Sequence, residues 1–401
     1  MKWMLEEETL RVPIRSWCEK PEKEAMEQAM NLANHPVVER HVALMPDCHT
    51  GYGMPIGGVI AARNAVLPSA VGVDIGCGMV AVQTNLPAER LSEMSARRAV
   101  MEAVKARVPL GEGVAHQHKQ EWEGFERYID VNGAETGFPS NLDRRNLGTL
   151  GGGNHFIEMQ RDGEGFVWLM IHSGSRNLGA RVEKHYQEIA KRLCASFHVA
   201  LPDRELPFLP MDIQEGRDYF RDMTFALEYA LENRRRMMAV FKEALAEAAP
   251  ETEFLQEVNI HHNYAAIEYH LGDNFYVHRK GATSAKEGEI GIIPGSMGTA
   301  SYIVRGLGNP LSFMSCSHGA GRAMSRTAAC CNLTVEACDA AMEGIVHDRW
   351  GKFKGFKGHL RGLTDLSEAP QAYKPIDEVI AAEADLVEPL VRLMPLAVLK
   401  G

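Results

Sequence analysis

Five glycine-rich segments constrain this chain more than any other feature, because each carries a polar side chain that can bind a metal ion or react. Glycine clusters cost backbone entropy, so a fold keeps them where the backbone needs a positive φ or a close approach. Their successive N–H groups are natural cradles for phosphate oxygens. None of them matches the P-loop or the dinucleotide-binding pattern. The segments are MPDCHTGYGMPIGG (45–58), VGVDIGCG (71–78), LGTLGGGNHFIE (147–158), IPGSMGTAS (293–301) and SCSHGAGR (315–322).

The composition is close to the average of globular proteins, with 45% hydrophobic and 24% charged residues in a chain of 401. Such a chain has enough apolar surface to offset its ordering entropy, which excludes global disorder. No apolar run reaches about 18 residues, and the acidic N-terminus lacks the apolar stretch of a signal peptide. We therefore expect a cytoplasmic protein without a membrane partner. The net charge of −10 argues against passive coating of nucleic acid.

The apolar patterns predict an α+β fold, because strands and helices are mixed without regular alternation. We expect a single large mixed domain over 1–401, with a helical insertion at 179–250. The Gly- and Pro-dense stretch 46–58 is predicted to be a loop. Strands are predicted at 41–45, 59–62, 79–83, 166–171, 275–279 and 289–293. Helices are predicted at 20–34, 90–107, 179–194 and 217–249, with a last helical zone at 376–393.

Candidate metal ligands gather at predicted strand ends and in the glycine-rich segments. Carboxylate, thiolate and imidazole together form a mixed donor set that suits a divalent transition metal. The alternative is a set of polar residues held by hydrogen bonds in the core. The candidates are Asp74, Cys77, His155, His172 and either His261 or His262, between which spacing does not choose.

His318 is a candidate nucleophile. It lies in the sequence CSHGAGR, where small neighbours leave the ring open to a bulky partner. An imidazole nitrogen attacks phosphorus readily, so phosphoryl or nucleotidyl transfer through a phosphoramidate is the natural chemistry. The alternative is a structural histidine that caps a turn.

The glycine-rich segments, together with further motifs, resemble those of the RtcB family of RNA ligases. The resemblance runs from about residue 40 to the terminal LKG and includes many motifs in order. The region 179–250 carries little of it. Besides the glycine-rich segments, the matching motifs are IHSGSRNLG, HHNY, HRKGA and EAPQAYKPID.

The resemblance implies a set of site residues. It implies two manganese ions bound by Asp74, Cys77, His155, His172 and His262, with the thiolate of Cys77 bridging them. It implies that GTP guanylylates His318. The residues that it implies for the guanylate are Asn154, His155, Phe156, Ile157, Glu158, His262, Asn263, Pro294, Gly295, Ser296, Met297, Ser301, His318, Gly319, Ala320, Gly321 and Lys400.

The implied activity joins RNA 3′-phosphate or 2′,3′-cyclic phosphate ends to 5′-hydroxyl ends, in RNA repair or tRNA splicing. Glu158 would accept from the guanine N–H edge while Lys400 donates to its carbonyl oxygen, a pairing that rejects adenine. Arg176 and Arg322 are expected to clamp RNA phosphates, unless they pair with carboxylates. An archease-like activator is an expected partner.

Two other functions compete with this one. A metal-binding RNA-repair accessory protein without ligation activity is disfavoured, because the matched ligands, His318, Glu158 and Lys400 are all present. A structural zinc protein is disfavoured because the chain lacks the compact Cys and His spacing of such sites. The departures from the family pattern are Cys48, where many members carry Val, the partly kept loop 109–118, and the basic, aromatic stretch 350–362. We expect this stretch to contact RNA by stacking and phosphate pairing; the alternative is a solvated basic loop.

Overall fold

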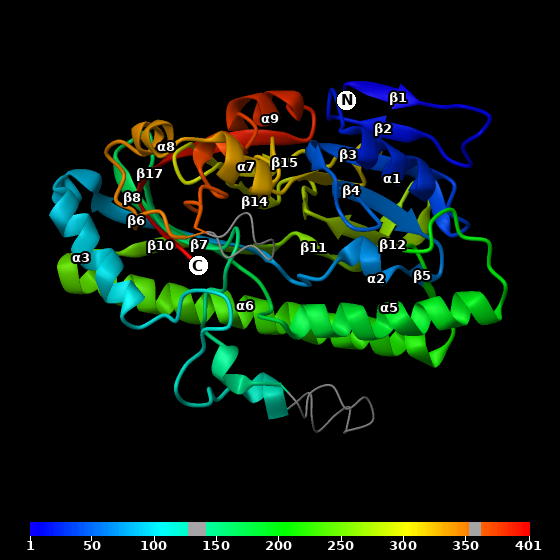
Figure 1. Cartoon of the computed structure of the whole chain (residues 1–401), viewed down its shortest axis with the longest axis horizontal. Helices are drawn as coiled ribbons and strands as arrows, with labels where there is room; N and C mark the ends of the chain where they lie inside the picture. Colours follow the sequence, from blue (N-terminus) through cyan, green and yellow to red (C-terminus); the bar gives the residue numbers. More distant parts are fainter. Residues whose placement is uncertain (127–141, 353–361) are drawn as a thin grey trace.

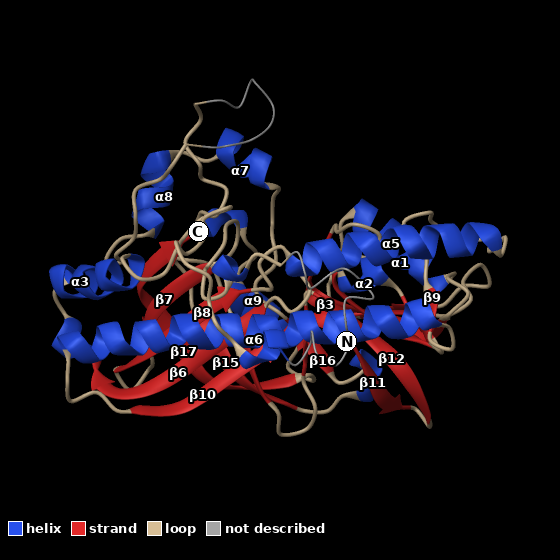
Figure 2. Cartoon of the chain, turned by 90° about the horizontal axis from the view of Figure 1, so that it is seen from below, coloured by secondary structure: helices blue, strands red, loops and turns tan. Residues whose placement is uncertain are grey.

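The computed structural model describes residues 1–126, 142–352 and 362–401. Two large sheets lie next to each other, and the long helix α6 (Gln214–Ala248) runs along both of them (Figures 1 and 2). The remaining α-helices are α1 (Lys23–Ala33), α2 (Pro68–Val71), α3 (Met94–Lys105), α5 (Leu178–Ser196), α7 (Arg326–Asn332), α8 (Val335–Ala341) and α9 (Ile376–Ala382). Short 3₁₀ helices are η1 (Ala88–Leu91), η3 (Arg144–Asn146), η4 (Pro310–Ser312) and η6 (Pro370–Ala372).

One sheet has six strands in the order β1-β2-β3-β4-β12-β11, antiparallel except for the parallel pair β2 and β3. Helix α1 covers one face through Ala29 and Leu32, while α9 and β15 cover the other. The strands are β1 (Trp3–Leu5), β2 (Ile14–Ser16), β3 (Val38–His49), β4 (Ile56–Ala62), β11 (Asn263–His270) and β12 (Asp273–Lys280).

The other large sheet has seven strands in the order β10-β6-β8-β7-β17-β15-β14. It curves so that its two edge strands, β10 and β14, contact each other. The strands are β6 (Gly78–Pro87), β7 (Phe156–Arg161), β8 (Phe166–Ser173), β10 (Phe254–His261), β14 (Ile290–Ile293), β15 (Ser301–Gly306) and β17 (Val387–Lys400). Two small ladders pair β5 (Ala65–Val66) with β9 (Leu209–Pro210), and β13 (Ala282–Ser284) with β16 (Ser315–Ser317).

The strand β6 shows why this sheet has two cores. Its side chains alternate between the faces. Val80 and Val82 pack with α3 and α6 on one face, while Met79 and Ala81 pack with β14 and β15 on the other. Both faces are apolar, so polar side chains concentrate where the strands end.

The mixture of helices and strands confirms the predicted α+β fold. Two predicted elements are wrong. The stretch 46–58 is not all loop, because β3 continues to His49 and β4 begins at Ile56. The zone 376–393 is helical only to Ala382, since the chain from Val387 onward pairs with β15 and β7 as β17. Pro389 and Pro395 lie inside this strand, where a helix would lose hydrogen bonds.

Helices α5 and α6 occupy most of the predicted insertion, but the division of the chain into domain and insertion stays a prediction. Within the described residues, no helix combines the length and the apolar character that crossing a membrane requires.

Candidate functional site

Four neighbouring strands bring the candidate metal ligands to one edge of the seven-stranded sheet. The strands β10, β6, β8 and β7 lie side by side in that order. In their ladders Gly78 pairs with both His261 and Ser173, and His172 pairs with Phe156. The residues that begin or end these strands therefore meet in space. They are Cys77 before β6, His155 before β7, His172 within β8 and His262 after β10.

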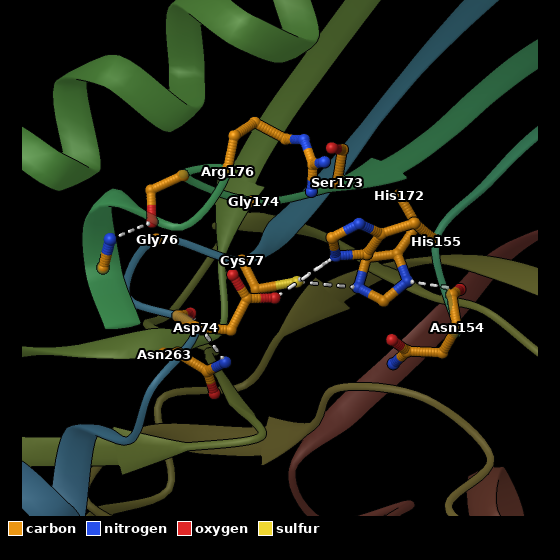
Figure 3. A network of polar contacts seen from close by, with 12 residues as sticks. Asp74, Gly76, Cys77, Asn154, His155, His172, Ser173, Gly174, Arg176 and Asn263 are labelled. Carbon is orange, nitrogen blue, oxygen red and sulfur yellow. Dashed lines mark hydrogen bonds and ion pairs between the residues drawn. The ribbon is translucent and has the colours of Figure 1, made fainter. Parts of the chain in front are cut away.

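The side-chain donor atoms of these residues converge. The Cys77 Sγ lies 3.1 Å from Nε2 of His172 and 3.5 Å from Nε2 of His155. The Asp74 Oδ2 is 3.2 Å from Nε2 of His155, and Nε2 of His172 is 3.3 Å from Nε2 of His262. Figure 3 shows the carboxylate of Asp74 and the sulfur of Cys77 pointing toward the imidazole rings. All the predicted metal ligands thus belong to one cluster.

Backbone carbonyls fix two of the rings. Nδ1 of His155 donates to the Leu150 carbonyl at 2.8 Å, and Nδ1 of His172 donates to the Asn154 carbonyl at 3.1 Å. Each Nε2 lone pair then faces the cluster, as in metal sites whose second ring nitrogen is hydrogen-bonded. His261 lies outside, because its Nδ1 is 3.0 Å from the Gly76 carbonyl. The structure therefore places His262, not His261, in the cluster.

The charges of the cluster suit a cation. Burial opposes ionisation of Asp74, but a hydrogen bond from Nε2 of His155, which exists only while that nitrogen is protonated, outweighs it and lowers the pKa of Asp74 to about 2; in the metal-binding form of the ring this proton is absent. Burial lowers the pKa of His172 and His262 well below the usual range. Burial, followed by the Asp74 charge, raises the pKa of the Cys77 thiol. Neutral imidazoles are the metal-binding form, and a cation would ionise the thiol. The cluster can therefore hold a divalent transition metal.

Two glycines allow side chains at the site to lie close to the backbone. A Cβ on Gly174 would lie 2.3 Å from Oδ1 of Asp74, so a larger residue would displace the carboxylate. Gly151 has a φ of +92°, and a Cβ there would lie 2.0 Å from the Arg176 guanidinium. These glycines are required by the site itself, not by turns elsewhere.

His318 stands next to the cluster. Its ring centroid is 4.9 Å from that of His262. Oδ2 of Asp47 accepts a hydrogen bond from Nδ1 of His318 at 2.6 Å and from its backbone N–H at 3.1 Å. Asp47 is completely buried, so these contacts are not shared with solvent. The arrangement directs the lone pair of Nε2 away from Asp47 and leaves it free to act as a nucleophile.

A cavity of about 180 Å³ opens beside His318. It is bounded on one side by the Pro294–Met297 turn and on the other by the strand ends near Asn154 and Lys400. Predicted guanylate residues that line it are Asn154, Phe156, Pro294, Gly295, Ser296, Met297, His318, Gly319, Ala320, Gly321 and Lys400.

The other predicted guanylate residues are not among those that line this cavity. Glu158 is buried on β7 and accepts from Nε2 of Gln160 at 2.9 Å, while Ser301 accepts from Nε2 of the same glutamine at 3.1 Å. Asn263 donates to the Asp74 carbonyl at 3.0 Å and accepts from the Gly281 N–H at 2.7 Å. His155 and His262 belong to the metal cluster. The side chain of Ile157 points to the opposite face of the sheet, into the core with α3 and α6.

A half-buried carboxylate, that of Glu368, binds the cations of the cavity. Glu368 pairs with Arg322 at 3.2 Å, Arg326 at 3.1 Å and Lys400 at 3.3 Å, and it accepts from the hydroxyl of Tyr373. Burial opposes its charge, but Lys400 and the arginines prevail and lower the pKa of Glu368 to about 2. Arg322 is therefore engaged by a carboxylate, which was the alternative to an RNA clamp.

The sequence reasoning missed Asp47, Glu368, Arg326 and Tyr373. The signal was available for three of them, since MPDCH contains Asp47 and EAPQAYKPID contains Glu368 and Tyr373. Of the proposed RNA contacts, Arg176 donates from Nε to the Thr149 hydroxyl at 3.1 Å. The stretch 350–362 lies mostly outside the described residues, which exclude 353–361.

Known proteins match this chain over nearly its whole length. The family model described as tRNA-splicing ligase RtcB matches residues 28–401. The RNA-splicing ligase RtcB of Escherichia coli (strain K12) is 39% identical, with 98% of each chain covered. The tRNA-splicing ligase RtcB of Archaeoglobus fulgidus is 33% identical over 95% of this chain and 92% of its own. The RNA-splicing ligase RtcB of Mycobacterium tuberculosis is 32% identical over 93% of this chain and 100% of its own.

Proposed function

Because the chain belongs to the RtcB family, we propose that it is an RNA ligase that joins 3′-phosphate or 2′,3′-cyclic phosphate ends to 5′-hydroxyl ends. The observation that carries this proposal is the position of His318. Its ring lines a cavity that Arg322, Arg326 and Lys400 also line, and it lies 4.9 Å from the ring of His262 in the metal cluster. Nothing in the described residues favours an accessory protein without ligation activity.

The proposed metal is manganese, with two ions held by Asp74, Cys77, His155, His172 and His262. When bound, the metal neutralises phosphate charge and orients the phosphates for in-line displacement. The fit rests on the donor set, because neutral imidazole nitrogens face one another at 3.3 Å beside a thiol and a carboxylate. Manganese and the ion count are part of the proposal.

The nucleophile in this proposal is Nε2 of His318, which attacks the α-phosphorus of GTP and releases pyrophosphate. A P–N bond forms as the P–O bond to pyrophosphate breaks. Asp47 holds the Nδ1 proton and stabilises the positive charge that develops on the ring. The RNA 3′-phosphate then attacks this guanylate and frees the histidine. The RNA 5′-hydroxyl finally displaces GMP, which seals the strand.

Selection of guanine falls to Glu158 and Lys400 in this proposal. They lie on neighbouring strands, since Glu158 pairs with Val398 and Lys400 pairs with Phe156 in the ladder of β7 and β17. Lys400 would exchange its contact with Glu368 for the guanine carbonyl oxygen. An adenine would leave a buried donor and a buried acceptor unpaired, which is costly.

A ligation assay tests the function. Short RNA donors ending in 3′-phosphate, 2′,3′-cyclic phosphate or 3′-hydroxyl are mixed with 5′-hydroxyl or 5′-phosphate acceptors, GTP and Mn²⁺. We expect joining only of the first two donors to 5′-hydroxyl acceptors, and none with His318→Ala. Joining of a 3′-hydroxyl donor to a 5′-phosphate acceptor would contradict the proposed end chemistry. The archease-like activator and the cytoplasmic location stay predictions.

A further inference from the structure

Two consecutive residues of α6, Asn233 and Arg234, lie directly behind the metal-ligand cluster. Both have 0% of their surface exposed. They belong to the part of the chain that carries little of the family motifs, and none of the sequence patterns singled them out. Helix α6 packs on the seven-stranded sheet through β6, β8 and β10, the strands that carry the ligands.

Arg234 donates to two backbone carbonyls beside metal ligands and lies against the ring of a residue beside a third. Its Nη1 donates to the carbonyl of Gly76 at 2.8 Å and to that of Ser173 at 2.9 Å. Its Nη2 is 3.2 Å from Nδ1 of His261. Gly76 directly precedes Cys77, Ser173 directly follows His172, and His261 directly precedes His262. One guanidinium therefore bonds two strand ends and lies beside a third.

Asn233 binds the loop that carries the fourth ligand. Its Oδ1 accepts from the N–H groups of Gly148 at 2.7 Å and Thr149 at 3.1 Å. Its Nδ2 is within hydrogen-bonding distance of the Gly174 carbonyl at 3.2 Å and the Ser173 hydroxyl at 3.1 Å. The next residue along this loop, Leu150, supplies the carbonyl that orients the ring of His155. Asn233 therefore joins the loop before His155 to the turn after His172.

The charge of Arg234 is unusual for a purely structural residue. Among the described residues, no carboxylate lies within ion-pair distance of it, and its partners are carbonyls, an amide oxygen and an imidazole. Burying an unpaired charge is unfavourable unless hydrogen bonds compensate for its lost hydration. The guanidinium is therefore held by the hydrogen-bond acceptors of the strand ends that surround it.

We propose that Asn233 and Arg234 are positioning residues that hold the strand ends around the cluster at metal-binding distance. The inference rests on the proposed metal function. It assigns to α6 a role in metal affinity that is separate from its packing in the core.

The test measures Mn²⁺ alone, by the electron paramagnetic resonance signal of free Mn²⁺ titrated with the full chain. The variants are Arg234→Met, Arg234→Lys and Asn233→Leu. We expect about 10- to 100-fold weaker binding for Arg234→Met and Asn233→Leu, the range seen when partners of metal ligands are removed. Arg234→Lys keeps the positive charge but loses the planar guanidinium with its fixed set of donors. Its Mn²⁺ affinity should therefore lie between that of Arg234→Met and that of the wild type.

Two controls on the same helix separate positioning from folding. Arg235→Gln alters an exposed neighbour whose side chain pairs with Glu232, and it should bind Mn²⁺ like the wild type. Phe241→Leu weakens the core behind the sheet, so it should lower the unfolding temperature without changing the Mn²⁺ dissociation constant. This contrast distinguishes loss of positioning from general destabilisation.

The outcomes are separable. Wild-type-like affinity, within about threefold, in folded Arg234→Met or Asn233→Leu overturns the inference and leaves the metal function intact. If Arg234→Met does not fold, the Mn²⁺ affinities of Asn233→Leu and Arg234→Lys test the inference, and values within about threefold of the wild type overturn it. Absence of Mn²⁺ binding by the wild type contradicts the proposed metal function itself, and the inference that rests on it falls with it.

Discussion

The buried carboxylate of Asp47 accepts two hydrogen bonds from His318, one from Nδ1 at 2.6 Å and one from the backbone N–H at 3.1 Å. The two residues lie 271 positions apart in the chain. The contact joins β3 of one sheet to the segment after β16, and it fixes both the rotation of the ring and the nitrogen that carries the proton.

Asp47→Asn should therefore slow guanylylation while the fold is kept. The amide oxygen can still accept from Nδ1 but carries no negative charge to stabilise a positive ring, and we expect a loss of about 100-fold or more in the rate of label transfer from GTP. The matched control is Asp348→Asn, which removes a surface ion pair with Lys105 and should leave the rate unchanged. Equal rates for Asp47→Asn and the wild type would contradict the assigned role.

Glu158 predicts a pH dependence of nucleotide binding. Burial raises the pKa of Glu158 to about 8, although Gln160 and Lys400 act in the opposite direction. The carboxyl group of Glu158 is therefore mostly neutral at pH 7. It accepts hydrogen bonds from guanine best when it is ionised. The affinity for GTP should therefore increase as the pH rises from about 7 to 9.

Glu158→Gln should remove this pH dependence and reduce the preference for GTP over ATP by about tenfold or more. Isothermal titration at several pH values measures both quantities. Glu164→Gln, an exposed change on the turn after β7, serves as the control. A pH-independent GTP affinity in the wild type would show that Glu158 does not contact the base.

Glu383 predicts a pH dependence of stability. Burial, and to a lesser extent the charge of Asp47, raises the pKa of Glu383 from 4.5 to about 8. The folded state then holds the proton more tightly than the unfolded state. The contribution to the free energy of unfolding is fully present below pH 4.5 and is lost as the pH rises through about 8.

Glu383→Gln cannot ionise, so the variant should gain stability relative to the wild type as the pH rises from 5 to 8. The difference should grow by at most about 1.4 kcal/mol per pH unit. Chemical unfolding at a series of pH values measures it. Parallel pH profiles for the two proteins would contradict the raised pKa.

The buried ion pair between Glu268 and Arg279 should contribute strongly to the free energy of unfolding. Arg279 is completely buried and donates to both carboxylate oxygens of Glu268, at 2.7 and 2.9 Å. Glu268→Gln leaves a buried charge without its partner, which should lower the free energy of unfolding by about 3 to 5 kcal/mol. Glu251→Gln, which breaks an exposed pair with Arg90, should leave the free energy of unfolding nearly unchanged, because solvent screens the pair. Similar losses in both variants would show that burial does not strengthen the pair.

The sequence allows prediction of the ligands because glycine-rich segments mark strand ends. Asp74, Cys77, His155 and His172 are recognisable from their position after or before apolar runs. The spacing does not choose between His261 and His262, because adjacent strand residues point to opposite sides and the register depends on β6.

Other features depend on contacts that local patterns do not encode. The Val- and Leu-rich C-terminus is compatible with a helix or a strand. It forms the strand β17 because it pairs with β7 and β15. The roles of Asp47 and Glu368 are set by partners far away in the chain, His318 and Lys400. The contacts of Arg234 follow from the packing of α6 across four strand ends, which no single segment reveals.

The most direct test of the central claim is the site of covalent labelling by GTP. The purified full chain is incubated with GTP labelled at the α-phosphate and Mn²⁺, without RNA, and the labelled peptide is sequenced by mass spectrometry. We predict one guanylate on His318, labile to acid and absent from His318→Ala. A guanylate on any other residue, or no covalent label while Mn²⁺ is bound, would contradict the assignment of His318 as the nucleophile.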